Sequence, residues 1–136
     1  MSRPHASREL VLRRFLDAYR DAWNHDDVDA ILRAYHVPSF TYKDATLHVF
    51  PDAESRRDYI AEFIEENRRQ GPASWEIVAF AATDLGHNSS LITARWVFRR
   101  LDDSVVWDFV DSYHVCRFDG RWEILVRTLH DEAGSP

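Results

Sequence analysis

Apolar residues recur at helical spacing in three segments of the first seventy residues. The first segment opens at Ser7, which can cap a helix running to about residue 24, and its apolar face carries Leu12, Phe15, Leu16, Tyr19 and Trp23. A second, shorter stripe follows Asp27, another capping residue. The third covers about residues 52–70 and stops at Gly71-Pro72. The pattern therefore predicts three N-terminal helices.

Strand patterns lie between the second and third predicted helices and in the last sixty residues. Residues 40–50 alternate loosely and predict one or two short strands, and longer ones are predicted over about 74–85, 90–101, 105–118 and 121–130. Asp119-Gly120 is a two-residue hairpin loop. Strands this long must bend or carry bulges. We expect an α+β cone, in which three N-terminal helices pack on the concave face of a strongly curved, mostly antiparallel sheet.

The hairpin loop also predicts which residues face each other across the last two strands. With Asp119-Gly120 as the loop, His114 faces Leu125 and Ser112 faces Arg127. His114, Ser112 and Arg127 then share one face, and the more apolar opposite face begins with Trp107 and Phe109. A sheet with two apolar faces needs two covers, so we expect a homodimer through the convex face.

Length, charge and hydropathy indicate how many domains the chain has, which partners it binds and where it is located. The length of 136 residues suits one domain, expected over residues 7–131 with flexible tails at 1–6 and 132–136. The net charge of -6 argues against nucleic acid as a partner. The early residues lack the apolar core of a signal peptide, and no stretch is long enough to span a membrane. We expect a cytoplasmic protein without a membrane partner.

Two segments resemble a known superfamily. Ala22-Trp-Asn-His-Asp-Asp-Val-Asp-Ala-Ile-Leu-Arg-Ala-Tyr35 is similar to the corner between the first two helices of the nuclear-transport-factor-2-like superfamily, and Arg117-Phe-Asp-Gly-Arg-Trp-Glu-Ile124 is similar to its final hairpin. That superfamily includes SnoaL-like cyclases and ketosteroid isomerase. The resemblance implies a cone with a pocket, but it does not select an activity, because other members are dehydratases or epoxide hydrolases, or only bind or dimerise.

The resemblance to ketosteroid isomerase also suggests catalytic candidates. It places Tyr19 and His114 where that family stabilises an oxyanion, which would turn the face of His114 inward. Its general base, an aspartate after the second helix, falls on Lys43 by ungapped count, and the neighbouring Asp44 is the candidate for that role. Burial raises the pKa of a carboxylate, which can then remove a proton beside a carbonyl, and hydrogen-bond donors can stabilise the enolate.

Several further side chains are expected to shape the pocket: His36, Tyr42, Trp96, Ser112 and Arg127. The turn Asp102-Asp103-Ser104 leaves two registers open. In one register, Arg95 and Arg99 lie opposite Ser112 and Asp108. In the other, Trp96 and Phe98 point inward and form an aromatic wall.

The leading hypothesis is a SnoaL-like protein that binds a small apolar carbonyl compound and performs cofactor-free isomerisation or dehydration. The alternative is a non-catalytic ligand-binding or dimerisation module. The seven histidines show no helical pair and no cysteine partner, and no cofactor fingerprint is present, so we expect neither metal nor cofactor. An open cavity of roughly several hundred Å3 would favour an enzyme. A cavity filled by Trp23, Phe63 and Trp96 would favour the alternative.

Overall fold

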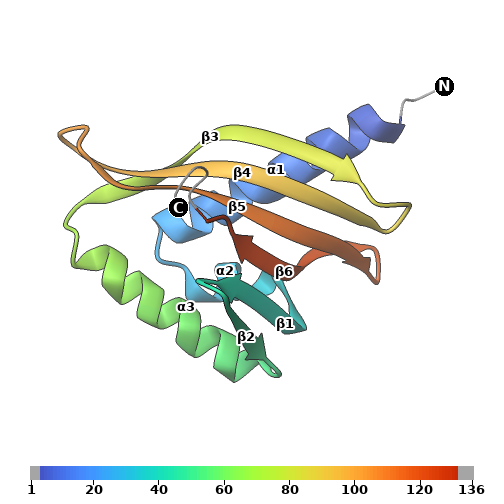
Figure 1. Ribbon diagram of the computed structural model, residues 1–136, viewed down its shortest axis with the longest axis horizontal. Helices are drawn as coiled ribbons and strands as arrows, with labels where there is room; N and C mark the ends of the chain where they lie inside the picture. The colour runs from blue at the N-terminus through green and yellow to red at the C-terminus, as the bar shows by residue number, and fades with distance from the viewer. Residues whose placement is uncertain (1–3, 132–136) are drawn as a thin grey trace.

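The computed structural model describes residues 4–131 and contains three helices and six strands (Figure 1). The helices are α1 (Pro4–Asn24), α2 (Val28–Arg33) and α3 (Ala53–Arg68). The strands are β1 (Tyr35–Lys43), β2 (Thr46–Phe50), β3 (Ala73–Asp84), β4 (Ser89–Arg100), β5 (Val105–Phe118) and β6 (Arg121–Leu129). The four long strands lie within one residue of their predicted bounds.

All six strands form one curved sheet, in the order β2-β1-β6-β5-β4-β3. Every neighbouring pair is antiparallel except β1 and β6, which are parallel. Figure 1 shows α1 crossing one face of β3, β4 and β5, while α3 lies beside the hairpin of β1 and β2. The α+β cone predicted from the sequence is confirmed.

Local polar contacts set the helix boundaries. Asp27 caps α2 as predicted, because its carboxylate accepts a hydrogen bond from the backbone N–H of Ala30 at 3.1 Å. Asp52 caps α3 by accepting from the N–H of Ser55 at 2.8 Å. The cap predicted at Ser7 is wrong, because α1 already begins at Pro4. Residues 4–6 of the expected N-terminal tail therefore belong to the helix, whereas 1–3 and 132–136 lie outside the described residues.

The β5–β6 hairpin departs from its predicted register at a bulge. Asp119 and Gly120 both have positive φ angles, +50° and +79°, which suits the predicted two-residue turn, and Phe118 pairs with Arg121. Farther along, Val115 pairs with Ile124 but His114 pairs with Val126, so Leu125 is skipped. The predicted pairings of His114 with Leu125 and of Ser112 with Arg127 are therefore wrong.

The bulge changes which side chains face the helices. Arg127 pairs with Tyr113 and shares the inner face with Asp111, whereas Ser112 pairs with Thr128 on the outer face. The assignment of the His114 face as the inner one is wrong.

Of the two registers left open for the turn after β4, the structure has the one in which Trp96 and Phe98 are buried. Arg95 instead forms an exposed ion pair with Asp108 at 2.7 Å.

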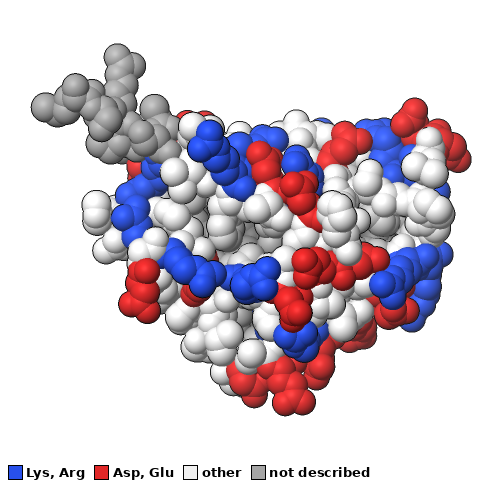
Figure 2. Space-filling view, turned by 180° about the vertical axis from the view of Figure 1, so that it is seen from behind, with Lys and Arg blue, Asp and Glu red and all other residues white. Residues whose placement is uncertain are grey.

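The core lies between the helices and the inner face of the sheet. Its fully buried aliphatic members include Leu12, Leu16, Ile31, Ile92 and Ile124. Full burial of each such side chain stabilises the fold by about 1.5–3 kcal/mol. Figure 2, seen from behind Figure 1, shows acidic and basic side chains interspersed on the surface. Within residues 4–131, no helix is both long enough and apolar enough to cross a membrane.

Candidate functional site

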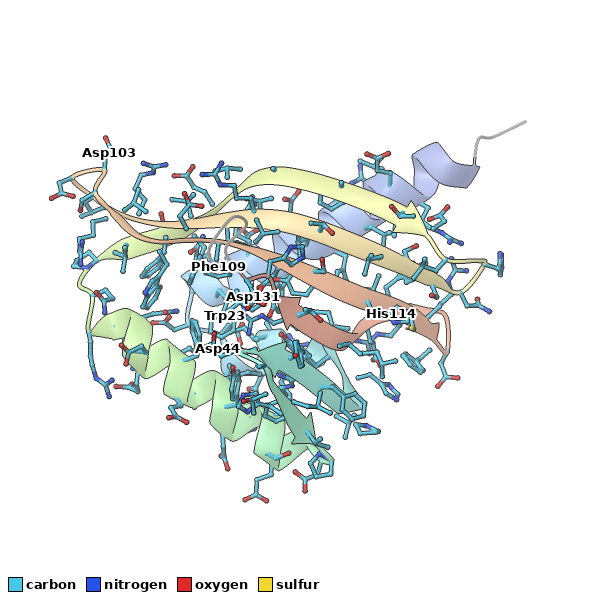
Figure 3. All side chains as sticks on the ribbon, viewed as in Figure 1. Trp23, Asp44, Asp103, Phe109, His114 and Asp131 are labelled. Atoms are coloured by element: carbon cyan, nitrogen blue, oxygen red, sulfur yellow. The ribbon has the colours of Figure 1, made fainter. Side chains whose placement is uncertain are left out.

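A cavity of about 40 Å3 lies where α1 and α3 meet the inner face of the sheet. Its base consists of buried side chains from α1 and from every strand except β2: Tyr19, Tyr35, Trp75, Trp96, Asp111, Tyr113 and Arg127. Its rim consists of half-buried aromatic side chains: Trp23, Tyr59, Phe63 and Phe109. Figure 3 shows Trp23 and Phe109 in the space between α3 and the sheet. The site is thus an aromatic hollow with a polar base.

Aromatic side chains occupy most of this hollow. The rings of Trp23 and Phe63 meet edge to face at 5.5 Å, and Tyr19 contacts Trp96 in the same manner at 6.3 Å. An apolar cavity that accommodates benzene measures about 150 Å3, well above the volume here. A ring-sized ligand would therefore require Trp23 or Phe63 to turn aside. These side chains leave a small cavity, not the large open one that would favour an enzyme.

The base of the cavity contains a buried ion pair. The Nε of Arg127 donates a hydrogen bond to Oδ2 of Asp111 at 2.8 Å, and the Tyr113 hydroxyl donates to the same oxygen at 2.9 Å. Burial alone lowers the pKa of Arg127, but Asp111 and the neighbouring tyrosines outweigh it and hold that pKa well above its ordinary value. Burial raises the pKa of Tyr113, and the charge of Asp111 adds to this shift. Arg127 is therefore charged and Tyr113 is neutral.

A pair of tyrosines adjoins the ion pair. The hydroxyl groups of Tyr19 and Tyr35 are 2.6 Å apart and share a hydrogen bond. Burial, followed by the influence of Tyr35, raises the pKa of Tyr19 well above its ordinary value, so Tyr19 keeps its proton. Behind Tyr35, the guanidinium of Arg56 lies 4.0 Å from the Tyr35 ring and 3.8 Å from the ring of Phe50. This stack fixes Tyr35 from the side away from the cavity.

Three polar atoms of the cavity lining find no hydrogen-bond partner among the described residues. They are the indole Nε1 of Trp75, the indole Nε1 of Trp96 and Oδ1 of Asp111. Buried polar groups are nearly always paired, and an unpaired one costs about 1–3 kcal/mol. These two donors and one acceptor are covered by their neighbours at rest, so a molecule that enters the cavity pairs with them only when surrounding side chains move.

Of the sequence-predicted residues, Tyr19, Trp96 and Arg127 line the cavity. Asp44 does not. It is exposed in the turn between β1 and β2, with a φ of +51°. Tyr42 is also exposed, at 43%.

The remaining predicted residues contact other groups on the sheet. The Nε2 of His114 is 3.0 Å from the hydroxyl of Ser89, and His114 is not among the residues that line the cavity (Figure 3). Ser112 hydrogen-bonds the outward-facing Thr93 at 3.0 Å. His36 pairs with Glu123 at 2.9 Å. The proposed trio of Tyr19, Asp44 and His114 therefore does not converge on one point.

Sequence reasoning missed the carboxylate that does line the cavity. Asp111 lies between Phe109 and Tyr113 on the more apolar face of β5, a position where an acid is costly unless it is paired. A lone acid on an otherwise apolar strand face was the available signal. Among the described residues, no group of histidine, cysteine and acidic side chains could hold a metal ion.

Comparisons with known proteins agree with this fold. Residues 8–132 match a family described as NTF2-like protein (DUF6841). No curated protein matches the chain.

Among solved structures, an NTF2-like protein of unknown function from Pseudomonas putida is similar, with a TM-score of 0.76 and 14% identity over 93% of this chain and 88% of that one. A protein of unknown function with a cystatin-like fold from Nostoc punctiforme has a TM-score of 0.73 and 9% identity over 93% of this chain and 92% of that one. An NTF2-like protein from Shewanella oneidensis has a TM-score of 0.68 and 20% identity over 93% of this chain and 99% of that one. At such identities the likeness concerns the fold alone.

Proposed function

The chain belongs to the NTF2-like family, and we propose that it binds a small apolar molecule bearing one polar group in the aromatic cavity. The observation that carries this proposal is the set of unpaired polar atoms in an otherwise aromatic lining: Nε1 of Trp75, Nε1 of Trp96 and Oδ1 of Asp111. Small-molecule sites combine apolar walls with a few placed polar groups in this way.

The distribution of burial gives the ligand an orientation. The unpaired atoms belong to residues of the buried base, whereas Trp23, Phe63 and Phe109 form the half-buried rim. The polar group of the ligand would pair at the base and its apolar body would lie against the rim. Because the resting cavity is small, ligand entry couples to movement of Trp23 or Phe63.

A second candidate function is proton transfer at the same site, in keeping with a cofactor-free isomerase or dehydratase acting on a carbonyl compound. The observation that favours it is the free Oδ1 of Asp111, which can accept a proton from a bound molecule, with the neutral hydroxyl of Tyr19 on the same cavity wall. In this scheme Asp111 takes the role that the sequence suggested for Asp44. Arg127 holds the other carboxylate oxygen of Asp111 by its hydrogen bond at 2.8 Å.

Three rings of similar size test the binding proposal: cyclohexanol, cyclohexanone and methylcyclohexane. Tryptophan fluorescence reports binding, because three tryptophans line the cavity. We expect the alcohol and the ketone to bind at least tenfold more tightly than the hydrocarbon. Asp111→Asn should weaken cyclohexanol most, because the alcohol proton loses its carboxylate acceptor.

Asp108→Asn is the matched control, since Asp108 lies exposed on the outer face in a pair with Arg95. It should leave all three affinities unchanged. Equal binding of the three rings, or no effect of Asp111→Asn on cyclohexanol, would contradict the proposal. Turnover of a carbonyl substrate that is lost in Asp111→Asn while binding persists would support the second candidate.

The outer face of the sheet supports a further part of the proposal, a homodimer. Register places Leu91, His114 and Val126 in one row, and this row continues through Phe40 to Val49 on the edge strand β2. Leu91 and Val49 are 36% and 54% exposed. Apart from His114 the row is apolar, and a row of this length across five strands suits a twofold contact with a second copy.

A further inference from the structure

A second and larger cavity, of about 350 Å3, lies at the ends of α1 and α3. Its lining comes from the last residues of α1, the turn before α2, the end of α3 and the start of the sheet: Trp23, Asn24, Asp26, Asn67, Arg68, Gly71, Pro72, Ala73 and Phe98. Only Trp23 is shared with the aromatic cavity. This end cleft is therefore a separate site that adjoins the aromatic cavity at Trp23.

Asn67 is the unusual residue of the end cleft. It is 5% exposed, and neither Oδ1 nor Nδ2 of its side chain has a hydrogen-bond partner among the described residues. Its backbone carbonyl is already used by the N–H of Gln70 at 3.1 Å. A buried side-chain amide with both groups unpaired costs stability and is rare in folded proteins. Both amide groups are covered at rest, so a molecule bound in the cleft pairs with them when the Asn67 side chain turns toward it.

Asn24, in the same cleft, shows the pairing that such an amide makes. Its Nδ2 donates to the backbone carbonyl of Trp75 at 3.1 Å, and its Oδ1 accepts from the Trp75 N–H at 2.7 Å. An asparagine side chain thus binds a donor and an acceptor on one group by two hydrogen bonds. Both amide groups of Asn24 are used in hydrogen bonds that stabilise the fold, whereas both amide groups of Asn67 are unpaired.

The charges and apolar surfaces of the cleft narrow the ligand class. Arg68, the cation named among the lining residues, is already paired with Asp26 at 3.2 Å and with Glu65 at 2.9 Å, which disfavours an anionic ligand. Trp23 and Phe98 supply aromatic surface. We propose that the end cleft binds a neutral small molecule through a carboxamide or lactam edge. Nδ2 of Asn67 donates to the carbonyl of that molecule, and Oδ1 accepts from its N–H.

The probes for this proposal are 2-piperidone and N-methyl-2-piperidone, which differ only in the lactam N–H. In a 15N-labelled sample, the side-chain NH2 signals of Asn67 report binding directly. We expect 2-piperidone to shift those signals in a saturable manner and to bind at least tenfold more tightly than its N-methyl analogue. Equal binding of the two lactams, or no saturable shift, would overturn the proposal.

Asn67→Leu provides a second readout. Leucine removes both unpaired groups at similar volume, so the variant should melt at a higher temperature than the wild type and lose the preference for 2-piperidone. Asn88→Leu, in an exposed turn, is the matched control and should keep that preference. A lower melting temperature for Asn67→Leu would mean that the amide is already satisfied, which overturns the proposal.

The end cleft and the aromatic cavity can be tested apart. Asp111→Asn lies outside the end cleft and should leave 2-piperidone binding unchanged. If the cyclohexanol test fails and the lactam test succeeds, the proposal for the aromatic cavity is rejected and the proposal for the end cleft is kept.

Discussion

At the scale of single residues, the polar groups at the base of the aromatic cavity decide what the site can do. Asp111 and Arg127 are 3% and 9% exposed in their side chains, so each depends on the other for its charge to be tolerated. The pair leaves Oδ1 of Asp111 available without leaving the whole carboxylate uncompensated. The same contacts that stabilise the base of the cavity therefore also supply its free acceptor.

Removing one member of this pair should be costly. We expect Arg127→Met to lose about 3–5 kcal/mol of unfolding free energy, because it leaves the buried charge of Asp111 without its partner. The double variant Arg127→Met with Asp111→Asn should recover most of that loss, since no isolated charge remains. Urea unfolding measures both.

Arg95→Met breaks the exposed Arg95–Asp108 pair and is the matched control, for which we expect little change. A single Arg127→Met variant as stable as this control would show that Asp111 does not need its partner.

At the scale of elements, the sequence predicts the helices and strands well and the orientation of the last hairpin poorly. Alternation and the Asp119-Gly120 turn locate β5 and β6, because these signals depend on neighbouring residues. The position of the bulge at Leu125 depends on how the curved sheet closes over α1 and α3, and no local sequence pattern predicts it. One skipped residue moved Arg127 to the inner face. His114 lies outside for a separate reason, because β5 turns Asp111 and Tyr113 inward, and alternation alone does not say which face of a strand is the inner one.

The cap of α3 gives a prediction at this scale. Hydrogen bonds from the backbone and hydroxyl of Ser55 lower the pKa of Asp52 in the folded chain. Its contribution to stability is therefore complete above the ordinary carboxyl pKa and is lost as the pH falls through the lowered value.

Asparagine also caps helices but does not titrate, so Asp52→Asn should show a smaller loss of stability than the wild type between about pH 5 and pH 2. Urea unfolding at both pH values measures this. An identical acid dependence in the two proteins would show that the Asp52 cap does not contribute to it.

At the scale of the whole molecule, the sheet separates two kinds of surface. Its inner face and the helix ends form the aromatic cavity and the end cleft, which meet at Trp23. Its outer face carries the apolar row from Leu91 to Val49 proposed for a second copy. Ligand binding and self-association can therefore change independently.

Self-association is testable by light scattering during size exclusion. We expect the wild type to elute with twice the chain mass, and Val49→Arg with Leu91→Arg to elute as a monomer, because two arginines would meet their own copies across the contact. Leu101→Arg, in an exposed turn, should leave the dimer intact. A monomeric wild type would refute the dimer but would not affect the cavity.

The most direct test of the central claim, a ligand in the aromatic cavity, is the contact between cyclohexanol and the indole protons. In a labelled sample at saturating cyclohexanol, the account predicts nuclear Overhauser effects from the ligand to the Nε1 protons of Trp75 and Trp96. Those effects should weaken in Asp111→Asn. Nuclear Overhauser effects confined to outer-face residues such as His114 and Ser112, with none at either indole, would contradict the claim that the ligand binds in the aromatic cavity.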